Sequence, residues 1–216
     1  MTSPSRKQRE LALRQEIIFE AAEAVLAERG FHRASVDEVA KRAEVSVGTL
    51  YNLFGNKENL YTSLFERGVD EVREAVRVRV AGATTGIDKL HAALDAIFSY
   101  FAEHQRAFRV YVTATHGMEW NVLPQFGDRV FQRMQAFLGD ITTLCRRAVR
   151  EDALPPIDAA LLAMALMGTA NSYVTHWATH RHGDLTAYQE GAHAILEALR
   201  RGRARRPVSG IRRPRA

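Results

Sequence analysis

Apolar residues recur every three or four positions along most of the chain, a spacing typical of amphipathic α-helices. A segment rich in glycine and threonine at 82–86 and two prolines at 155–156 mark breaks in the pattern. We therefore expect an all-α fold. The helices that the pattern predicts cover residues 7–29, 57–80, 87–103, 106–116, 121–151, 157–181 and 185–201.

The stretch 35–60 has the pattern of three short segments of helix joined by tight turns. Ser35 and Glu38 predict a capping box for the first helix, and Ser46 can cap the second. The positions expected to face inward in these two helices are Val36, Val39, Ala40, Ala43, Leu50 and Phe54. Two short helices joined by a three-residue turn form a helix-turn-helix, whose second helix, here 46–53, can enter the major groove of DNA.

The outward positions of the second helix suit contacts with DNA. Glycine lets the backbone approach closely, and hydroxyl and amide groups can bond bases or phosphates. Lys57 adds a cation beside the free N–H groups of the next helix, which favours a phosphate. The candidate DNA-binding residues are Ser35, Val47, Gly48, Thr49, Tyr51, Asn52 and Lys57. The alternative is an ordinary three-helix core with a solvated polar face.

The segments Thr49-Leu50-Tyr51, Phe54 and Asn56-Lys57-Glu58, with the preceding VDEVAKRAEVSVG, resemble the DNA-binding domain of TetR-type (TetR/AcrR family) transcriptional regulators. The resemblance covers about residues 12–72. It implies an all-helical, repressor-like dimer with a ligand-binding C-terminal domain.

Two positions depart from the family pattern. Glu44 stands where the family usually has glycine in the turn, so a positive φ there would be strained by about 1 kcal/mol. Val47 stands where many members have a polar or charged residue, which leaves the operator sequence open while DNA binding is still expected. An apolar Val47 suits the methyl group of thymine.

The resemblance and the breaks divide the chain into four parts. We expect a flexible N-terminal arm at 1–11 and a helix-turn-helix domain at 12–72, with the motif at about 35–54. A regulatory domain for ligand binding and dimerisation is expected at 73–201, followed by a disordered, arginine-rich tail at 202–216.

The formal net charge of +5 is concentrated at this end of the chain, because residues 200–216, which include the tail, hold eight arginines and no acid. The rest of the chain therefore carries −3, and attraction to DNA must depend on the placement of cations such as Arg6, Lys7, Arg9 and Lys57. The single cysteine fits a reducing compartment. The first ten residues have no apolar core of a secretory signal, so a cytoplasmic protein is expected, nucleoid-associated when bound to DNA.

Small and apolar residues on the last two predicted helices indicate a symmetric four-helix dimer interface, although both faces could also pack within one subunit. The candidate interface residues are Met164, Gly168, Ala187, Tyr188, Gly191, Ala194, Ile195 and Ala198. Aromatic residues and methionines with a few polar groups indicate an apolar cavity for a small-molecule effector. Its candidate lining residues are Phe101, Phe108, Tyr111, His116, Trp120, Phe126, Met134, Asn171 and Trp177.

Other chemistry has little support in the sequence. His176 and His180 have a spacing that can hold a metal, but no partner acid lies at a suitable position, so neither a metal nor a cofactor is expected. His91, His104 and His193 are scattered along the sequence and are interpreted as surface residues or as residues with satisfied hydrogen bonds. No catalytic motif is recognisable. Two alternatives remain: a ligand-binding module or enzyme with a vestigial helix-turn-helix, and a non-specific nucleic-acid binder that uses the arginine tail.

Overall fold

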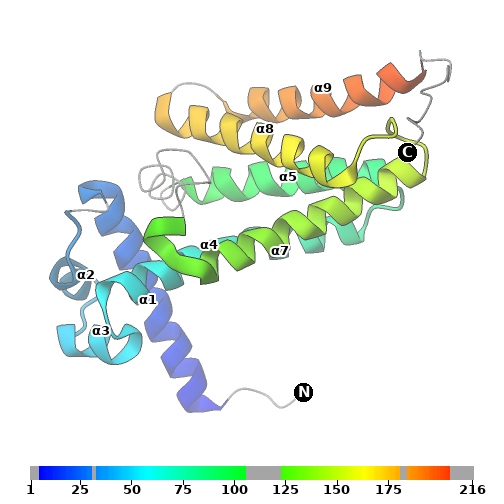
Figure 1. Cartoon of the computed structure of the whole chain (residues 1–216). Coiled ribbons are helices and arrows are strands. Elements are labelled where there is room, and N and C mark those ends of the chain that lie inside the picture. The colour runs from blue at the N-terminus through cyan, green and yellow to red at the C-terminus, as the bar shows by residue number, and fades with distance from the viewer. Residues whose placement is uncertain (1–4, 31–32, 106–122, 181–183, 205–216) are drawn as a thin grey trace, which may run out of the picture.

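The computed structural model describes residues 5–30, 33–105, 123–180 and 184–204, and the regular structure of these residues is entirely helical (Figure 1). This confirms the all-α fold class. The described helices are α1 (Arg6–Arg29), α2 (Val36–Arg42), α3 (Val47–Phe54), α4 (Lys57–Ala81), α5 (Gly86–Glu103), α7 (Leu123–Arg150), α8 (Ala159–His180) and α9 (Leu185–Ala204).

The first core joins α1, α2, α3 and the beginning of α4. Apolar side chains from all four helices are buried in it, as the helical spacing predicts. Val130 of α7 is buried in the same core, so one turn of a later helix completes the N-terminal domain. The largest contributors are Ile18, Leu26, Val39, Leu50, Phe54, Leu60, Tyr61 and Phe65.

The second core lies among the rest of α4 and helices α5, α7, α8 and α9. Figure 1 shows these helices as a bundle that extends from the N-terminal domain. Helix α4 contributes Leu60 and Leu64 to the first core and Val72 and Val76 to the second, so it passes through both. The other main residues of the second core are Leu90, Leu94, Phe98, Ile141, Cys145, Leu154, Leu166 and Leu196.

Several helix ends differ from the expected ones. Helix α1 begins at Arg6, because Ser5 and Gln8 form a capping box, so residues 6–11 are helical and the expected arm at 1–11 is wrong there. Helix α9 continues to Ala204, which places 202–204 in a helix instead of the tail. Among the described helices, none combines the length and hydropathy needed to span a membrane.

A kink in α7 was not expected from the sequence. Gly127 has φ 72° and ψ 179°, which is not helical and favours glycine, so the first turn of α7 points away from the remaining helix. The kink lies three residues before Val130. It therefore sits where α7 meets the N-terminal domain.

Candidate nucleic-acid interface and regulatory domain

Helix α3 presents a polar face to solvent and an apolar face to the first core. The Ser46 hydroxyl accepts a hydrogen bond from the Thr49 backbone N–H at 3.1 Å and so caps the helix, as predicted. Leu50 and Phe54 are buried. Tyr51, like Gly48 and Asn52, is exposed. The exposed side of α3 can therefore enter a groove of DNA.

Three of the candidate DNA contacts have structural roles as well. Val47 was expected to point outward, but it is half-buried and packs against the first core. The Thr49 and Ser46 hydroxyl oxygens lie 2.9 Å apart, so Thr49 is already hydrogen-bonded within the helix. Ser35 caps α2 by accepting the Glu38 N–H at 3.2 Å. These residues position the recognition helix in addition to any contact with DNA.

The expected capping box of α2 is incomplete. The Ser35 hydroxyl donates to the Glu38 carboxylate, and this carboxylate also lies 3.2 Å from Arg29 Nε of α1. Glu38 thus ties α2 to α1 instead of bonding to the Ser35 N–H.

The turn between α2 and α3 is strained in the manner expected. Glu44 has φ 55°, a conformation that glycine adopts easily and a residue with a Cβ does not. The backbone of Val45 still reaches back to donate to the Ala40 carbonyl at 3.0 Å. The turn therefore keeps this hydrogen bond although the backbone of Glu44 is strained.

Lys57 opens α4 at the same end of the molecule. Asn56 caps this helix through its Oδ1, which accepts the Asn59 N–H at 2.7 Å. The Lys57 ammonium lies 5.7 Å from the centre of the Tyr61 ring, and burial raises the pKa of Tyr61 to about 12. The cation is held beside free N–H groups of the helix terminus, an arrangement that suits a phosphate.

An ion pair between α4 and α7 links the two domains. Glu66 of α4 is only 5% exposed, and both of its oxygens accept hydrogen bonds from Arg129, which is next to Val130 on α7. Arg133 Nε lies 3.9 Å from the same carboxylate and 3.3 Å from Asp70. Sequence reasoning missed this pair. The available signal was an acid directly after Leu64 and Phe65, two buried positions of α4.

A second set of contacts runs from α5 to the recognition helix. The Tyr100 hydroxyl of α5 donates to Glu71 at 2.9 Å, and Arg67 of α4 donates to Glu71 and to Glu16 of α1, both at 2.5 Å. Burial raises the pKa of Tyr100, which keeps its hydroxyl a donor.

This set of contacts continues through aromatic rings. The Arg67 guanidinium lies 5.4 Å from the centre of the Phe19 ring, which is 5.6 Å from the ring of Phe54 in α3. The regulatory domain and the recognition helix are therefore joined by continuous contacts.

The structure tests only part of the expected ligand cavity. Phe101 and Trp177 are half-buried and pack against the second core, and Asn171 is half-buried on α8. Met134 packs against the first core instead, which contradicts its place in a cavity of the regulatory domain. Four further candidates, and the side chain of the fifth, lie outside the described residues: Phe108, Tyr111, His116, Trp120 and Phe126.

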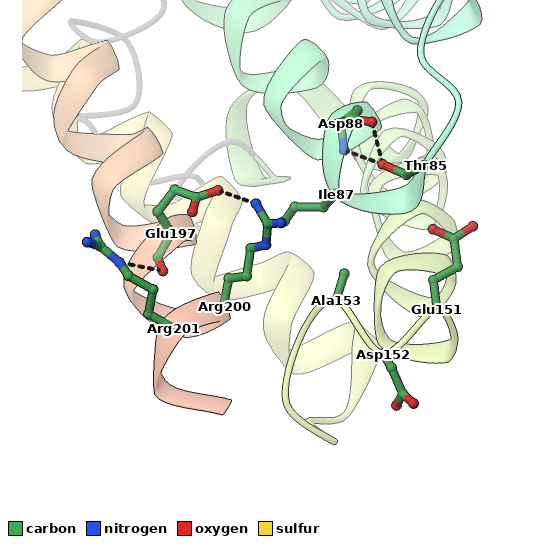
Figure 2. A pocket seen from close by; sticks show the side chains of 9 residues that line it. All are labelled: Thr85, Ile87, Asp88, Glu151, Asp152, Ala153, Glu197, Arg200 and Arg201. Carbon is green, nitrogen blue, oxygen red and sulfur yellow. Dashed lines mark hydrogen bonds and ion pairs between the residues drawn. The ribbon is translucent and has the colours of Figure 1, made fainter. Parts of the chain in front are cut away.

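A groove of about 780 Å³ is lined by residues at the start of α5, just after α7 and near the end of α9 (Figure 2). These parts of the bundle lie at the opposite end from α3 (Figure 1). The groove shares no residue with the candidate ligand cavity. Glu197 stands at its edge and lies 3.4 Å from Arg200. The groove is lined by Thr85, Ile87, Asp88, Glu151, Asp152, Ala153, Glu197, Arg200 and Arg201.

Most of the expected dimer residues lie on the surface of α8 and α9. Met164 and Ile195 are 44% and 38% exposed. Tyr188 is half-buried, and its hydroxyl lies 2.7 Å from Nδ1 of His176. Gly191 differs from the expectation, because a Cβ on it would lie 3.3 Å from the Tyr173 ring of α8 in the same chain. The remaining members are exposed: Gly168, Ala187, Ala194 and Ala198.

The structure brings two supposedly scattered histidines together. Nδ1 of His91 on α5 lies 2.6 Å from Nδ1 of His193 on α9. Their Nε2 atoms approach Glu197 at 3.0 Å and Asp95 at 2.8 Å respectively. These four groups hold α9 against α5, so His91 and His193 are hydrogen-bonded, as one of the two interpretations allowed, although they are not scattered.

His176 and His180 stack with ring centres 4.1 Å apart. Among the described residues, no three histidine, cysteine or acidic side chains are grouped so that they could hold a metal ion.

An N-terminal helix-turn-helix, continued by α4 into a larger helical domain, defines a DNA-binding regulator with a separate regulatory domain. A family model described as "Bacterial regulatory proteins, tetR family" matches residues 18–64. Residues 18–64 therefore form a DNA-binding domain of this family's type, as the sequence motifs indicated.

Relatives and solved structures agree over most of the chain. The fatty acid metabolism regulator protein of Bacillus subtilis is 27% identical over 197 residues, which cover 90% of this chain and 93% of that protein. The transcriptional activator FasR of Mycolicibacterium smegmatis is 28% identical over 157 residues, covering 73% and 68% respectively.

Among solved structures, the fatty acid degradation regulator FadR of Bacillus halodurans has a TM-score of 0.74 at 26% identity, covering 84% of this chain and 96% of that chain. FadR of Bacillus subtilis in complex with stearoyl-CoA has a TM-score of 0.73 at the same identity and coverage. Because these proteins are named as regulators, the chain is a transcriptional regulator and not an enzyme.

Proposed function

We propose that the chain is a homodimeric repressor that binds a near-palindromic operator through residues 46–53 of each protomer and is released by a small amphipathic ligand. The observation that carries this proposal is the exposed polar face of α3, held by a buried Leu50 and Phe54. In two protomers, two such helices would enter successive major grooves. The proposed domains are 12–72 for DNA binding and 73–201 for regulation and dimerisation.

The residues of the proposed interface have different tasks. Gly48 and Asn52 are exposed and suited to base edges, whereas Tyr51 and Lys57 would hold the phosphates. Val47 would contribute to reading only with the part of its side chain that is outside the core. The variant Lys57→Ala should weaken binding to all DNA sequences and reduce the salt slope by about one unit for each protomer of the dimer.

The proposed dimer interface rests on the exposed apolar surface of α8 and α9. Arginine at an exposed position of this surface should separate the protomers, because a desolvated charge would face its symmetric copy. Gly191 is unsuitable for that test, since it faces Tyr173 in its own chain. We therefore expect Ala194→Arg to give monomers in sedimentation, while Ala136→Arg, at an exposed alanine of α7, should leave dimers intact.

The proposed effector is a long-chain acyl-CoA. Support comes from the likeness to FadR of Bacillus subtilis, whose solved structure contains stearoyl-CoA. The aromatic residues Phe101 and Trp177, half-buried in the regulatory domain, suit an apolar acyl chain.

Two sets of contacts could couple ligand binding in the regulatory domain to the position of α3. One is the ion pair of Glu66 with Arg129, and the other runs from Tyr100 through Arg67 to Phe54. The ligand would favour a state in which the two recognition helices are wrongly spaced for the operator.

The test has two stages. Selection from random double-stranded DNA should return one near-palindromic sequence, and no preferred sequence would contradict the proposal. Stearoyl-CoA should then weaken operator binding by about 5- to 150-fold, and operator DNA must weaken stearoyl-CoA binding by the same factor. Equal ligand affinity with and without operator would rule out this effector as the switch. One relative is named an activator, so the sign of regulation needs its own test. If the chain is a repressor, a reporter gene under the operator should be transcribed more strongly when the gene for this chain is deleted.

A further inference from the structure

The beginning of α1 is exposed to solvent. Residues 5–14 are all exposed, and the first buried residue of the helix is Ile18. Figure 1 shows this part of α1, in blue, projecting beyond the body of the molecule at the end that carries α2 and α3. We call residues 6–14 the α1 extension, which at 1.5 Å per residue is about 13 Å long.

The α1 extension is strongly basic. It contains Arg6, Lys7, Arg9 and Arg14 against a single acid, Glu10, which pairs with Arg6 at 2.6 Å. The first turn holds no acidic residue. Cations near a helix N-terminus oppose the helix dipole, so this distribution reduces the stability of the helix. A positively charged partner would be repelled, whereas a polyanion would offset the unfavourable placement.

The cations also share a direction. At 100° per residue, the four basic positions fall within an arc of about 160° around the helix. Lys7, Arg14 and Ala21 are seven positions apart and lie on nearly the same side, and Ala21 is buried against the first core. The basic side of the extension therefore continues the side of α1 that packs on the DNA-binding domain.

A membrane surface fits the extension less well. Binding to lipid needs a continuous apolar face opposite a basic one. Leu11 and Leu13 are exposed by 45% and 64%, but two positions along a helix are about 200° apart. They therefore lie on opposite sides and form no common face.

We propose that the α1 extension is a second DNA-binding surface, which contacts the phosphates of the duplex beside the half-site bound by α3. This inference rests on the proposed function, because it assumes a specific operator. Its polar groups are mainly cations, and the Gln8 side chain is engaged in the capping box, so the extension should add affinity and salt dependence without altering the preferred sequence. The occupant is double-stranded DNA, by charge complementarity and by continuity with the helix-turn-helix domain.

The test compares two double variants that remove equal charge. Lys7→Gln with Arg14→Gln changes the extension, and glutamine preserves helix propensity. Arg79→Gln with Arg146→Gln removes two exposed cations from the far part of α4 and from α7, and is the matched control. Circular dichroism checks that all proteins are equally helical. Affinity for the selected operator is then measured between 50 and 200 mM salt.

We expect the extension variant to reduce the salt slope by about 3.6 units, because the dimer loses two phosphate contacts in each protomer and each lost contact is worth about 0.9 units. The loss of operator affinity relative to the wild type should therefore be about 150-fold smaller at 200 mM salt than at 50 mM salt. The control variant should keep the wild-type slope, and sequence selection with the extension variant should return the same operator.

Equal slopes for the extension and control variants would overturn the inference, and would leave the proposed function intact if the wild type still selects an operator. Failure of the wild type to select any operator would instead contradict the proposed function itself. Binding to phosphatidylglycerol vesicles that the extension variant loses, with an unchanged salt slope on DNA, would assign the surface to lipid and also overturn the inference.

Discussion

Replacing Arg129 by methionine should be far more damaging than its exposed position indicates. The Arg129 side chain is 63% exposed, but its partner Glu66 is covered. Arg129→Met leaves the carboxylate buried without its two charge-assisted bonds. Breaking a buried ion pair in this way costs about 3–5 kcal/mol. Solvation of Arg129 in the wild type and the nearby Arg133 reduce the expected cost to about 2 kcal/mol.

The reverse change should be mild, because Glu66→Gln removes the buried charge and leaves Arg129 free to remain in water. We expect a cost of about 1 kcal/mol or less for this variant. The double variant should be more stable than Arg129→Met alone, with a coupling energy of about 1–2 kcal/mol. Such a difference between the two single variants is expected when a buried carboxylate is paired with an exposed guanidinium.

Urea denaturation at one fixed protein concentration measures these differences, since any dimer makes apparent stability depend on concentration. The same pair of helices provides a matched control. Arg73 of α4 and Asp140 of α7 are 2.5 Å apart, but both are about half exposed, so Arg73→Met should cost less than about 0.5 kcal/mol. The reasoning is refuted if Arg129→Met costs no more than Arg73→Met, or if the double variant is no more stable than Arg129→Met.

Residues with positive φ, a closely packed glycine and a buried thiol give three further predictions about stability and reactivity. Glu44→Gly and Asp152→Gly should each raise the free energy of unfolding by about 0.5–1 kcal/mol, because these residues have φ 55° and 59°, and a lower urea midpoint would contradict this. Gly86→Ala should lower it by about 1–3 kcal/mol in thermal unfolding, since the new Cβ would lie 2.5 Å from the Ala148 backbone nitrogen. Burial raises the pKa of the Cys145 thiol to about 12, so the thiol should stay protonated and unreactive at pH 8 until urea unfolds the chain, and immediate labelling would disprove this.

The helix-turn-helix could be predicted because its determinants are local. Ser46 and Asn56 lie at the caps of their helices, and the positions of Leu50 and Phe54 follow from helical spacing alone. The strain at Glu44 was also predictable, since the resemblance to the family names the residue type that the turn requires. Such features need only a few neighbouring residues.

The remaining differences depend on contacts between distant segments. Glu66 and Arg129 are 63 positions apart, and periodicity along one helix does not identify partners at that distance. Met134 joins the first core because the kink at Gly127 and the buried Val130 bring α7 onto the N-terminal domain. Gly191 faces inward because its neighbour is Tyr173 of another helix. A sequence pattern shows which residues are apolar, but it does not show which core they enter.

Helix α4 has a consequence for how this chain can change in evolution. The two domains meet within a continuous helix of 25 residues and not at a loop. Inserting one residue between Glu66 and Val72 would turn everything beyond it by about 100° and shift it by about 1.5 Å. An insertion in a surface loop changes little, whereas one between Arg67 and Glu71 would separate Arg129 from Glu66 and Glu71 from Arg67 together. The number of residues in α4 between the first and the second core is therefore constrained, and tolerated insertions should lie outside this segment.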